Sequence, residues 1–195
     1  AIGQTKLMDT YRSSFVKEGF HCAQILLTRE DFDDRQRYLN AKNTLLQLLS
    51  MKKVVPIINE NDTISTDEIK FGDNDQLSAL VATLVNADML IMLSDVDGLL
   101  DKGKNLVRVV DNITHEIKEL ASPSVKKTSV GGMITKIEAA RIAMNAGVLC
   151  VIANGHKEEI ILSAVKAPEK SGTLFIPKKC LDAKSQPVIS RRLIE

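Results

Sequence analysis

The chain has 195 residues, of which 44% are hydrophobic and 26% are charged, and its formal net charge is +1. This composition is ordinary for a globular protein, and the near-zero charge gives no general attraction to nucleic acid or to a membrane. No apolar run approaches the roughly 20 residues of a membrane span, and three scattered cysteines without a CxxC pair favour a reducing, cytoplasmic setting.

The elements that hydrophobic periodicity predicts alternate between helices and strands. A first helix, with Leu7, Tyr11 and Phe15 along one side, is expected to end before Gly19. Further helices are predicted over 34–50, 75–85, 114–121, 133–145 and 157–165. Strands are predicted over 22–28, 54–59, 89–94, 148–153 and 173–176, with an exposed strand or hairpin arm over 106–110. This alternation predicts an α/β fold whose parallel sheet is covered by helices on both faces.

One domain is expected over residues 1–177, because no linker, repeat or low-complexity tract interrupts the predicted elements. Residues 178–195 are more basic than the rest of the chain. This segment is interpreted as a solvated tail or as the start of a further small domain.

Acidic and amide side chains follow the strand predicted over 54–59. The stretch from Asn59 to Asp75 contains six acidic residues and one basic residue, with asparagines between them. Ligands of parallel α/β sheets bind at the carboxyl ends of the strands, where carboxylates can hold a metal ion or an ammonium group. Amides can donate to a carboxylate without adding charge, so the combination suits an amino acid. The alternative is a solvated acidic surface.

Two further stretches are candidates for contacts with phosphate. Asp95 and Asp97-Gly98 follow the buried strand over 89–94, which predicts a tight turn, a nucleotide contact or the opening of a haloacid dehalogenase-like phosphatase. The paired Gly131 and Gly132 precede a helix with Lys136 in its first turn. Backbone N–H groups at such a helix start attract anions, although a plain helix entry is the alternative.

Five stretches together resemble the amino acid kinase family: IINENDTI, EIKFGDNDQLSA, LIMLSDVDGLL, VGGMITKIEAA and GTLF. The likeness runs from residue 1 to about residue 175. It implies a three-layer α/β/α sandwich around a mainly parallel sheet. Within the family, the motifs resemble those of kinases that use ATP and Mg²⁺ to phosphorylate the side-chain carboxylate of L-glutamate. The product would be L-glutamyl 5-phosphate, at the first step of proline biosynthesis.

The resemblance also implies roles for individual residues. Substrate-binding positions match Asp62 and Asn74, with Asn59 and Asp73 beside them, and Asp75 matches an acid that orients catalytic lysines. Nucleotide contacts match Ser94, Asp95 and the loop of Val130, Gly131, Gly132, Met133, Ile134, Thr135 and Lys136. Lys136 would stabilise the transferring phosphoryl group. Val130 departs from the threonine usual in the family, which removes a hydroxyl contact to phosphate.

Family members usually begin with a lysine-bearing strand and glycine-rich loops, whereas residues 1–8 match a later helix. We therefore expect a missing N-terminal part, little activity of the chain alone and a tendency to aggregate. The resemblance implies a homo-oligomer that binds neither nucleic acid nor a membrane. Two alternatives are a phosphatase that uses Asp95 and Asp97, and a non-catalytic fragment with a kinase fold.

Overall fold

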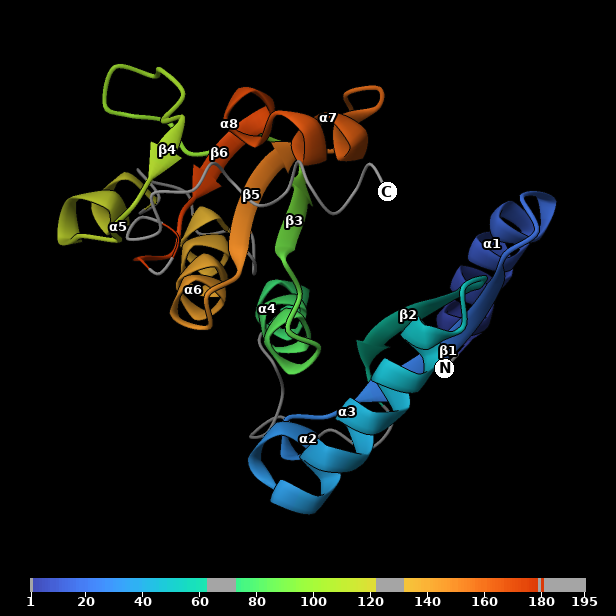
Figure 1. Ribbon diagram of the computed structural model, residues 1–195. Coiled ribbons are helices and arrows are strands. Elements are labelled where there is room, and N and C mark those ends of the chain that lie inside the picture. The colour runs from blue at the N-terminus through green and yellow to red at the C-terminus, as the bar shows by residue number, and fades with distance from the viewer. Residues whose placement is uncertain (1, 63–72, 122–131, 179, 181–195) are drawn as a thin grey trace. The chain divides into compact units, whose positions relative to one another are not determined.

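The computed structural model describes residues 2–62, 73–121, 132–178 and 180, with the side chain of Ile2 excepted. The chain divides into two compact units, residues 1–77 and residues 78–195 (Figure 1). We call them unit 1 and unit 2.

Unit 1 contains two long helices, one short helix and a two-stranded parallel sheet. In chain order these are α1 (Ile2–Lys17), β1 (His21–Leu27), α2 (Glu30–Asp33), α3 (Arg35–Ser50) and β2 (Val54–Glu60). The strands pair in register from His21 opposite Val54 to Leu27 opposite Glu60, so their carboxyl ends lie at the same edge. Pro56 is accommodated opposite Ala23 in this sheet.

The helices of unit 1 begin and end for identifiable reasons. Gly19 adopts a positive φ of 74° just after α1, which is the conformation that glycine takes most easily at a helix end. Asp34 caps α3, because its side chain accepts a hydrogen bond from the backbone N–H of Arg37 at 2.8 Å. Along α3 only Leu45 is fully buried, so this helix packs through a narrow stripe.

Unit 2 contains a four-stranded sheet in the order β3-β5-β6-β4. Helix α4 (Asn74–Leu84) leads into this unit, followed by β3 (Met89–Ser94), β4 (Val109–Val110), α5 (His115–Ala121), α6 (Met133–Asn145), β5 (Leu149–Asn154), α7 (Ile160–Lys166), α8 (Pro168–Ser171) and β6 (Gly172–Phe175). Strands β3 and β5 are parallel, whereas β6 runs antiparallel to β5.

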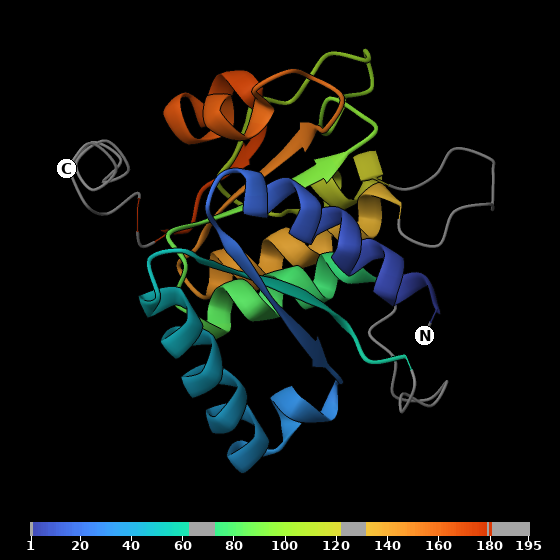
Figure 2. The same ribbon diagram turned by 90° about the vertical axis from the view of Figure 1, so that its right-hand side faces the viewer.

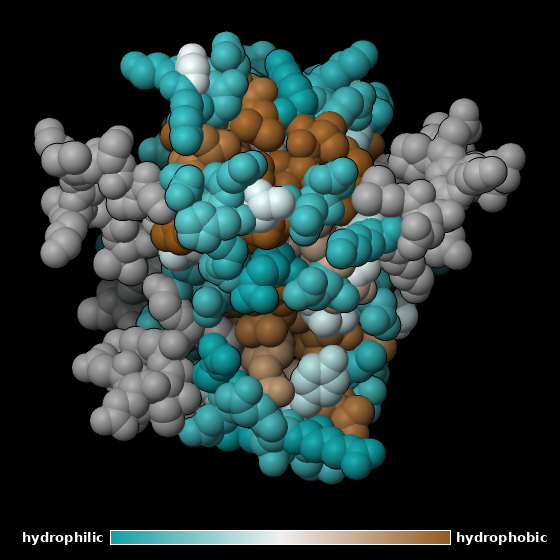
Figure 3. Space-filling model, turned by 90° about the vertical axis from the view of Figure 1, so that its left-hand side faces the viewer, coloured by the Kyte–Doolittle hydropathy of each residue, from teal (hydrophilic) through white to brown (hydrophobic). Residues whose placement is uncertain are grey.

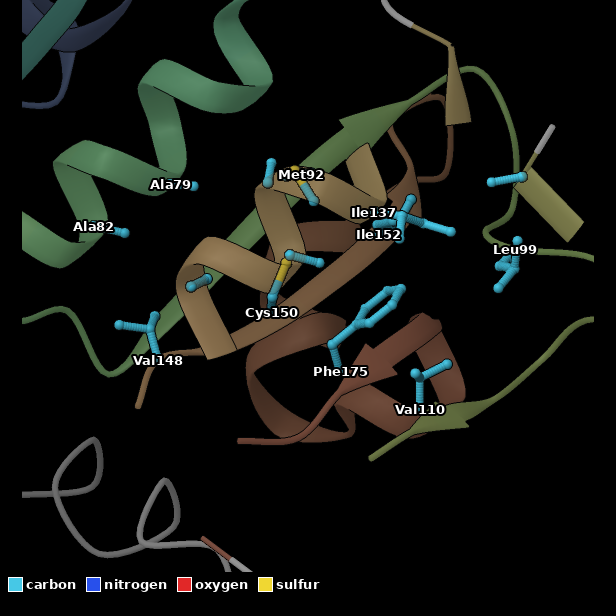
Figure 4. Packing of buried hydrophobic residues seen from close by; sticks show 14 residues of the cluster. Ala79, Ala82, Met92, Leu99, Val110, Ile137, Val148, Cys150, Ile152 and Phe175 are labelled. Carbon is cyan, nitrogen blue, oxygen red and sulfur yellow. The ribbon is translucent and has the colours of Figure 1, made fainter. Parts of the chain in front are cut away.

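The sheet of unit 2 is covered on both faces, as a sandwich requires (Figures 1 and 2). Cys150 and Ile152 of β5 share one core cluster with residues of α4, of α6 and with Phe175 of β6 (Figure 4). The alternate residues Val151 and Ala153 pack with α7 on the opposite face. Because successive side chains of a strand point to opposite faces, one central strand serves two cores. The expected three-layer α/β/α arrangement is therefore confirmed in unit 2.

The predicted elements agree with the structure in type and, within a few residues, in position. The short helices α2 and α8 were not predicted, and the segment over 106–110 forms only the two-residue strand β4, with an isolated bridge between Leu100 and Leu106. Most of the predicted basic tail lies outside the described residues. Hydrophobic side chains also reach the surface among the hydrophilic ones that cover most of the face in Figure 3.

Candidate functional site

The carboxyl ends of β1 and β2 form one edge of the sheet in unit 1. The backbone N–H of Asn61 donates to the carbonyl oxygen of Leu27 at 2.9 Å, which carries the parallel pairing just past β2. Asp62, a predicted substrate-binding residue, follows there and is exposed. The sequence prediction that acidic and amide groups gather at the ligand edge of a parallel sheet therefore holds for Asn59, Glu60 and Asp62.

Asn59 is held by two hydrogen bonds of its side chain. Its Oδ1 accepts from the backbone N–H of Glu60 at 2.9 Å, and its Nδ2 donates to Oε1 of Gln4 at 3.0 Å. Gln4 lies on α1, 55 residues earlier in the chain, and no local pattern marks it as a site residue. Its Nε2 is buried and has no hydrogen-bond partner among the described residues.

The run Asp73-Asn74-Asp75 lies at the start of α4, and its three side chains have different environments. Asp73 Oδ1 accepts from the backbone N–H of Gln76 at 3.2 Å, which caps the helix. The other oxygen, Oδ2, is buried, and within the described ranges it has no hydrogen-bond partner. Asn74 is exposed and Asp75 is partly buried. One carboxylate oxygen suffices for the cap, so Oδ2 of Asp73 and the exposed side chain of Asn74 take no part in it.

A second polar cluster in unit 1, not predicted from sequence, follows β1. Asp31 accepts from the backbone N–H of Thr28 at 2.6 Å and pairs with Nε of Arg37 at 2.8 Å. Glu30 also pairs with Arg37, at 2.6 Å. Burial alone raises the pKa of Asp31, but the hydrogen bonds from Thr28 and Arg37 outweigh it and hold this pKa below its ordinary value. The cluster joins α2 to α3 at the end of β1.

In unit 2 the carboxyl ends of β3 and β5 meet at one edge. Ser94 pairs with Asn154 in the register of the two strands, and the backbone N–H of Gly155 donates to the carbonyl oxygen of Ser94 at 2.8 Å. The hydroxyl of Ser94 donates to Oδ1 of Asp95 at 3.2 Å. The two predicted nucleotide contacts are therefore adjacent, and Asp95 is exposed.

Asp97 lies in the same edge and bridges the two strand ends. Its Oδ1 pairs with Nζ of Lys157 at 2.7 Å and accepts from Nδ2 of Asn154 at 3.1 Å. The hydrogen bond from Lys157 and then that from Asn154 hold the pKa of Asp97 below its ordinary value. The carboxylate thus has a structural task, closing the loop after β3 onto the loop after β5.

Gly98 lies in the bend that follows β3. Its φ is 143°, and an added Cβ would lie 2.5 Å from Oγ1 of Thr173. That hydroxyl accepts a hydrogen bond from the backbone N–H of Leu99 at 2.9 Å in the interior. A side chain at position 98 would be strained and would separate β6 from this turn, so the path of the chain after Asp95 is fixed.

The start of α6 carries the predicted nucleotide loop in part. Gly132 caps the helix, and the hydroxyl of Thr135 donates back to the carbonyl oxygen of Gly132 at 2.8 Å. Met133 and Ile134 pack against the core, so any contact they make with a nucleotide would use backbone atoms. Lys136 is partly buried in the first turn. Val130 and Gly131 lie outside the described residues.

The predicted site residues fall into two groups. The predicted substrate residues Asn59, Asp62, Asp73 and Asn74 belong to unit 1, together with Asp75, which was predicted to be catalytic. The predicted nucleotide residues belong to unit 2, together with Lys136, the other residue predicted to be catalytic. Besides the cluster around Arg37, sequence reasoning missed the polar residues Gln4, Asn154 and Lys157. Their roles depend on contacts between distant segments, for which the sequence offers no local signal.

The described residues contain neither a metal-binding cluster nor a helix that could span a membrane. No group of three or more His, Cys, Asp or Glu residues is placed to hold a metal ion. None of the helices in those ranges is both long enough and apolar enough to cross a membrane.

Comparison with known proteins places these observations in a family. The model of the amino acid kinase family matches residues 1–154. The chain is 47% identical to the glutamate 5-kinase of Caldanaerobacter subterraneus subsp. tengcongensis, over 99% of its own length and 51% of that relative. The same values apply to the glutamate 5-kinase of Thermoanaerobacter sp. strain X514. The glutamate 5-kinase of Clostridium acetobutylicum is also 47% identical, over 91% of the chain and 68% of the relative.

The chain spans about half the length of the first of these curated relatives. Among solved structures, that of smu.665 from Streptococcus mutans UA159 matches with a TM-score of 0.51 at 18% identity, over 85% of this chain and 64% of the other. This likeness supports the fold.

Proposed function

This chain belongs to the amino acid kinase family, and we propose that it contributes the acidic substrate loop and the nucleotide edge of a glutamate 5-kinase. The reaction transfers the γ-phosphoryl group of ATP to the side-chain carboxylate of L-glutamate, the first step of proline biosynthesis. Residues 1–177 would form one amino acid kinase domain, which acts in a cytoplasmic homo-oligomer. The similarity to the named kinases supports this assignment.

The proposal rests on the different environments of the two carboxylate oxygens of Asp73. One oxygen caps α4, while the other is buried and lacks a hydrogen-bond partner among the described residues. A buried carboxylate oxygen without a donor is unfavourable, and the ammonium group of an amino acid supplies one. Asp62 and Asn74, both exposed at the two ends of the same loop, add a second carboxylate and an amide for the substrate.

The nucleotide would contact the residues of unit 2. The backbone N–H groups at the start of α6 and the side chain of Lys136 suit the phosphates of ATP, and Ser94 with Asp95 suits its nucleoside part. Mg²⁺ would be held mainly by ATP phosphates and water, as this ion prefers. In the phosphatase alternative Asp95 would be the nucleophile and Asp97 the second acid, but Asp97 is held by Lys157 and Asn154, and no contact among the described residues favours that alternative.

The chemistry requires positioning and charge neutralisation rather than a covalent intermediate. A carboxylate that attacks a phosphate brings two anions together, so cationic groups must offset the charge that develops in transfer. Lys136 would do so directly, and Asp75 would orient lysines. The ammonium-binding carboxylates would hold the substrate in place for the attack.

The test uses two aspartates that both cap helices. In the full-length gene product, with glutamate hydroxamate formation as the assay, Asp73→Asn should raise the KM for glutamate about 30-fold or more, because a partly dry ion pair is lost. Asp34→Asn changes the cap of α3 in the same way and should leave this KM unchanged. Equal KM values in wild type and Asp73→Asn, or no ATP-dependent reaction with glutamate, would contradict the proposal.

Two further variants separate substrate binding from phosphoryl transfer. Asp62→Ala should also raise the KM for glutamate by about 30-fold or more. Lys136→Met should lower kcat far more than it alters glutamate binding, because its contact forms with the transferring group. If Lys136→Met left kcat unchanged, the start of α6 would be an ordinary helix N-terminus without a role in phosphoryl transfer.

A further inference from the structure

The amide orientations of Asn59 and Gln4 follow from a single backbone group. The N–H of Glu60 can only donate, so the atom of Asn59 that it contacts at 2.9 Å is the oxygen Oδ1. The other end of the Asn59 amide is then Nδ2, which must donate. Its contact with Gln4 at 3.0 Å therefore fixes the accepting atom as Oε1 of Gln4.

This assignment leaves the NH₂ group of Gln4 as a buried donor. Nε2 carries two N–H bonds, and across the described residues it has no acceptor. Buried donors are almost always paired, so an unpaired one close to a candidate binding loop points to a ligand atom. The missing partner must be an acceptor, which excludes an ammonium group or another cation at this position.

A carboxylate fits this donor better than other acceptors do. The neighbouring loop is acidic, with Glu60 and Asp62 directly after Asn59, so an anion is repelled there unless a dedicated donor holds it. An amide offers hydrogen bonds without adding charge to balance. Asp73 belongs to the same unit, and its Oδ2, which has no hydrogen-bond partner in the described part of the chain, suits an ammonium group. An α-amino acid carries its ammonium and its α-carboxylate on the same carbon.

We propose that Gln4 is a specificity-determining residue whose Nε2 donates to the α-carboxylate of the bound amino acid, with Asn59 fixing the orientation of the Gln4 amide. This inference rests on the proposed function, because it takes glutamate as the substrate. It assigns to α1 a direct part in substrate selection, and it gives Asn59 a positioning role in place of direct binding.

The experiment compares glutamate with isoglutamine, in which the α-carboxylate is an amide and the side-chain carboxylate is unchanged. Both are assayed as substrates of the full-length gene product. Gln4→Leu should raise the KM for glutamate at least 10-fold, leave the KM for ATP within twofold, and remove the preference for glutamate over isoglutamine. Gln4→Glu places a carboxylate where the donor was. It should therefore reverse the preference, since the amide of isoglutamine can donate to it.

The matched control is Gln36→Glu, because Gln36 also pairs with an asparagine, Asn40, at 3.2 Å on the exposed surface of α3 in the same unit. This control should leave all three KM values unchanged. If Gln4 has only a structural role, Gln4→Leu and Gln4→Glu will lower thermal stability and leave the ratio of the two substrates as in wild type. That result would overturn the inference.

Calorimetric binding separates this inference from the proposed function. If wild type binds glutamate more tightly than isoglutamine but transfers no phosphate, and Gln4→Glu reverses the ratio, the inference stands and the kinase assignment fails. If transfer to glutamate occurs and the Gln4 variants keep the wild-type ratio, the assignment stands and the inference fails. Absence of glutamate binding by wild type would overturn both.

Discussion

The two units differ in how completely they bury their hydrophobic side chains. Among the residues that the structure describes, all the buried hydrophobic ones except Leu27, Leu45 and Leu77 belong to unit 2. In β5 four consecutive residues are fully buried, whereas every residue of β2 keeps intermediate exposure. Unit 2 therefore has a closed core of its own, while unit 1 is held by a thinner stripe of apolar contacts and by polar clusters.

The difference extends to the candidate site. The two buried polar atoms without hydrogen-bond partners in the described ranges, on Gln4 and Asp73, both lie in unit 1. At the edge of the sheet in unit 2, Asp97 is engaged by Lys157 and Asn154. Polar side chains that already have hydrogen-bond partners are held in fixed positions. A bound ligand stabilises the protein most where it supplies a partner to a buried polar atom that lacks one.

The largest effect is expected from removing the centre of the unit 2 core. Phe175 is fully buried between α6 and the sheet, so Phe175→Ala should lower the free energy of unfolding of this unit by about 3–5 kcal/mol. Chemical denaturation with hydrogen exchange would show the loss at the amides of β5. An equal loss of protection in β1 and β2 would mean that the two units unfold as one.

A smaller but local effect is expected at Gly98. The variant Gly98→Ala forces a positive φ on alanine and places its Cβ against Thr173, which should cost roughly 1–3 kcal/mol. Thermal unfolding measures this cost. The control Gly3→Ala meets no atom within 4 Å and should not destabilise. Equal stability of the Gly98 variant would show that β6 and the turn after β3 are loosely joined.

A pH effect is expected in unit 1, where Asp31 is paired with Arg37. The folded pKa of Asp31 lies below its ordinary value of 3.8, so its stabilising contribution is complete above that pH. The contribution is lost as the pH falls through the folded pKa. Asp31→Asn should cost roughly 1 kcal/mol at pH 7, and the cost should become smaller as the pH falls below 3.8. Unfolding curves at pH 7 and at about pH 3 test this, and a constant difference would be against it.

The smallest effect is expected on the outer side of α3. Leu49 is 50% exposed, so Leu49→Ala should change the free energy of unfolding by less than about 0.5 kcal/mol. The buried neighbour Leu45 provides the contrast, since Leu45→Ala should cost about 2–5 kcal/mol. A large loss on changing Leu49, measured by the same denaturation curves, would mean that this face is covered in solution.

Much of the fold could be predicted from local pattern. The helix over 133–145 and the strand over 89–94 were predicted with the bounds that the structure shows, because hydrophobic periodicity and glycine stops act within a few residues. The acid-amide run at 73–75 was also recognisable, since a helix cap needs only one of its carboxylates. Local chemistry thus indicated where to look for the site.

The rest was decided by contacts between distant segments. The direction of β6, antiparallel to β5 and parallel to β4, is seen only in its pairing with these two strands and has no local signal in the sequence. The hydrogen bond between Gln4 and Asn59 spans 55 residues, and that between Leu99 and Thr173 spans 74. The sequence by itself determined the elements and the chemical groups, whose rules are local. Only the tertiary structure decided which groups are paired and which remain buried without a partner, because pairing depends on where the packed chain brings remote residues together.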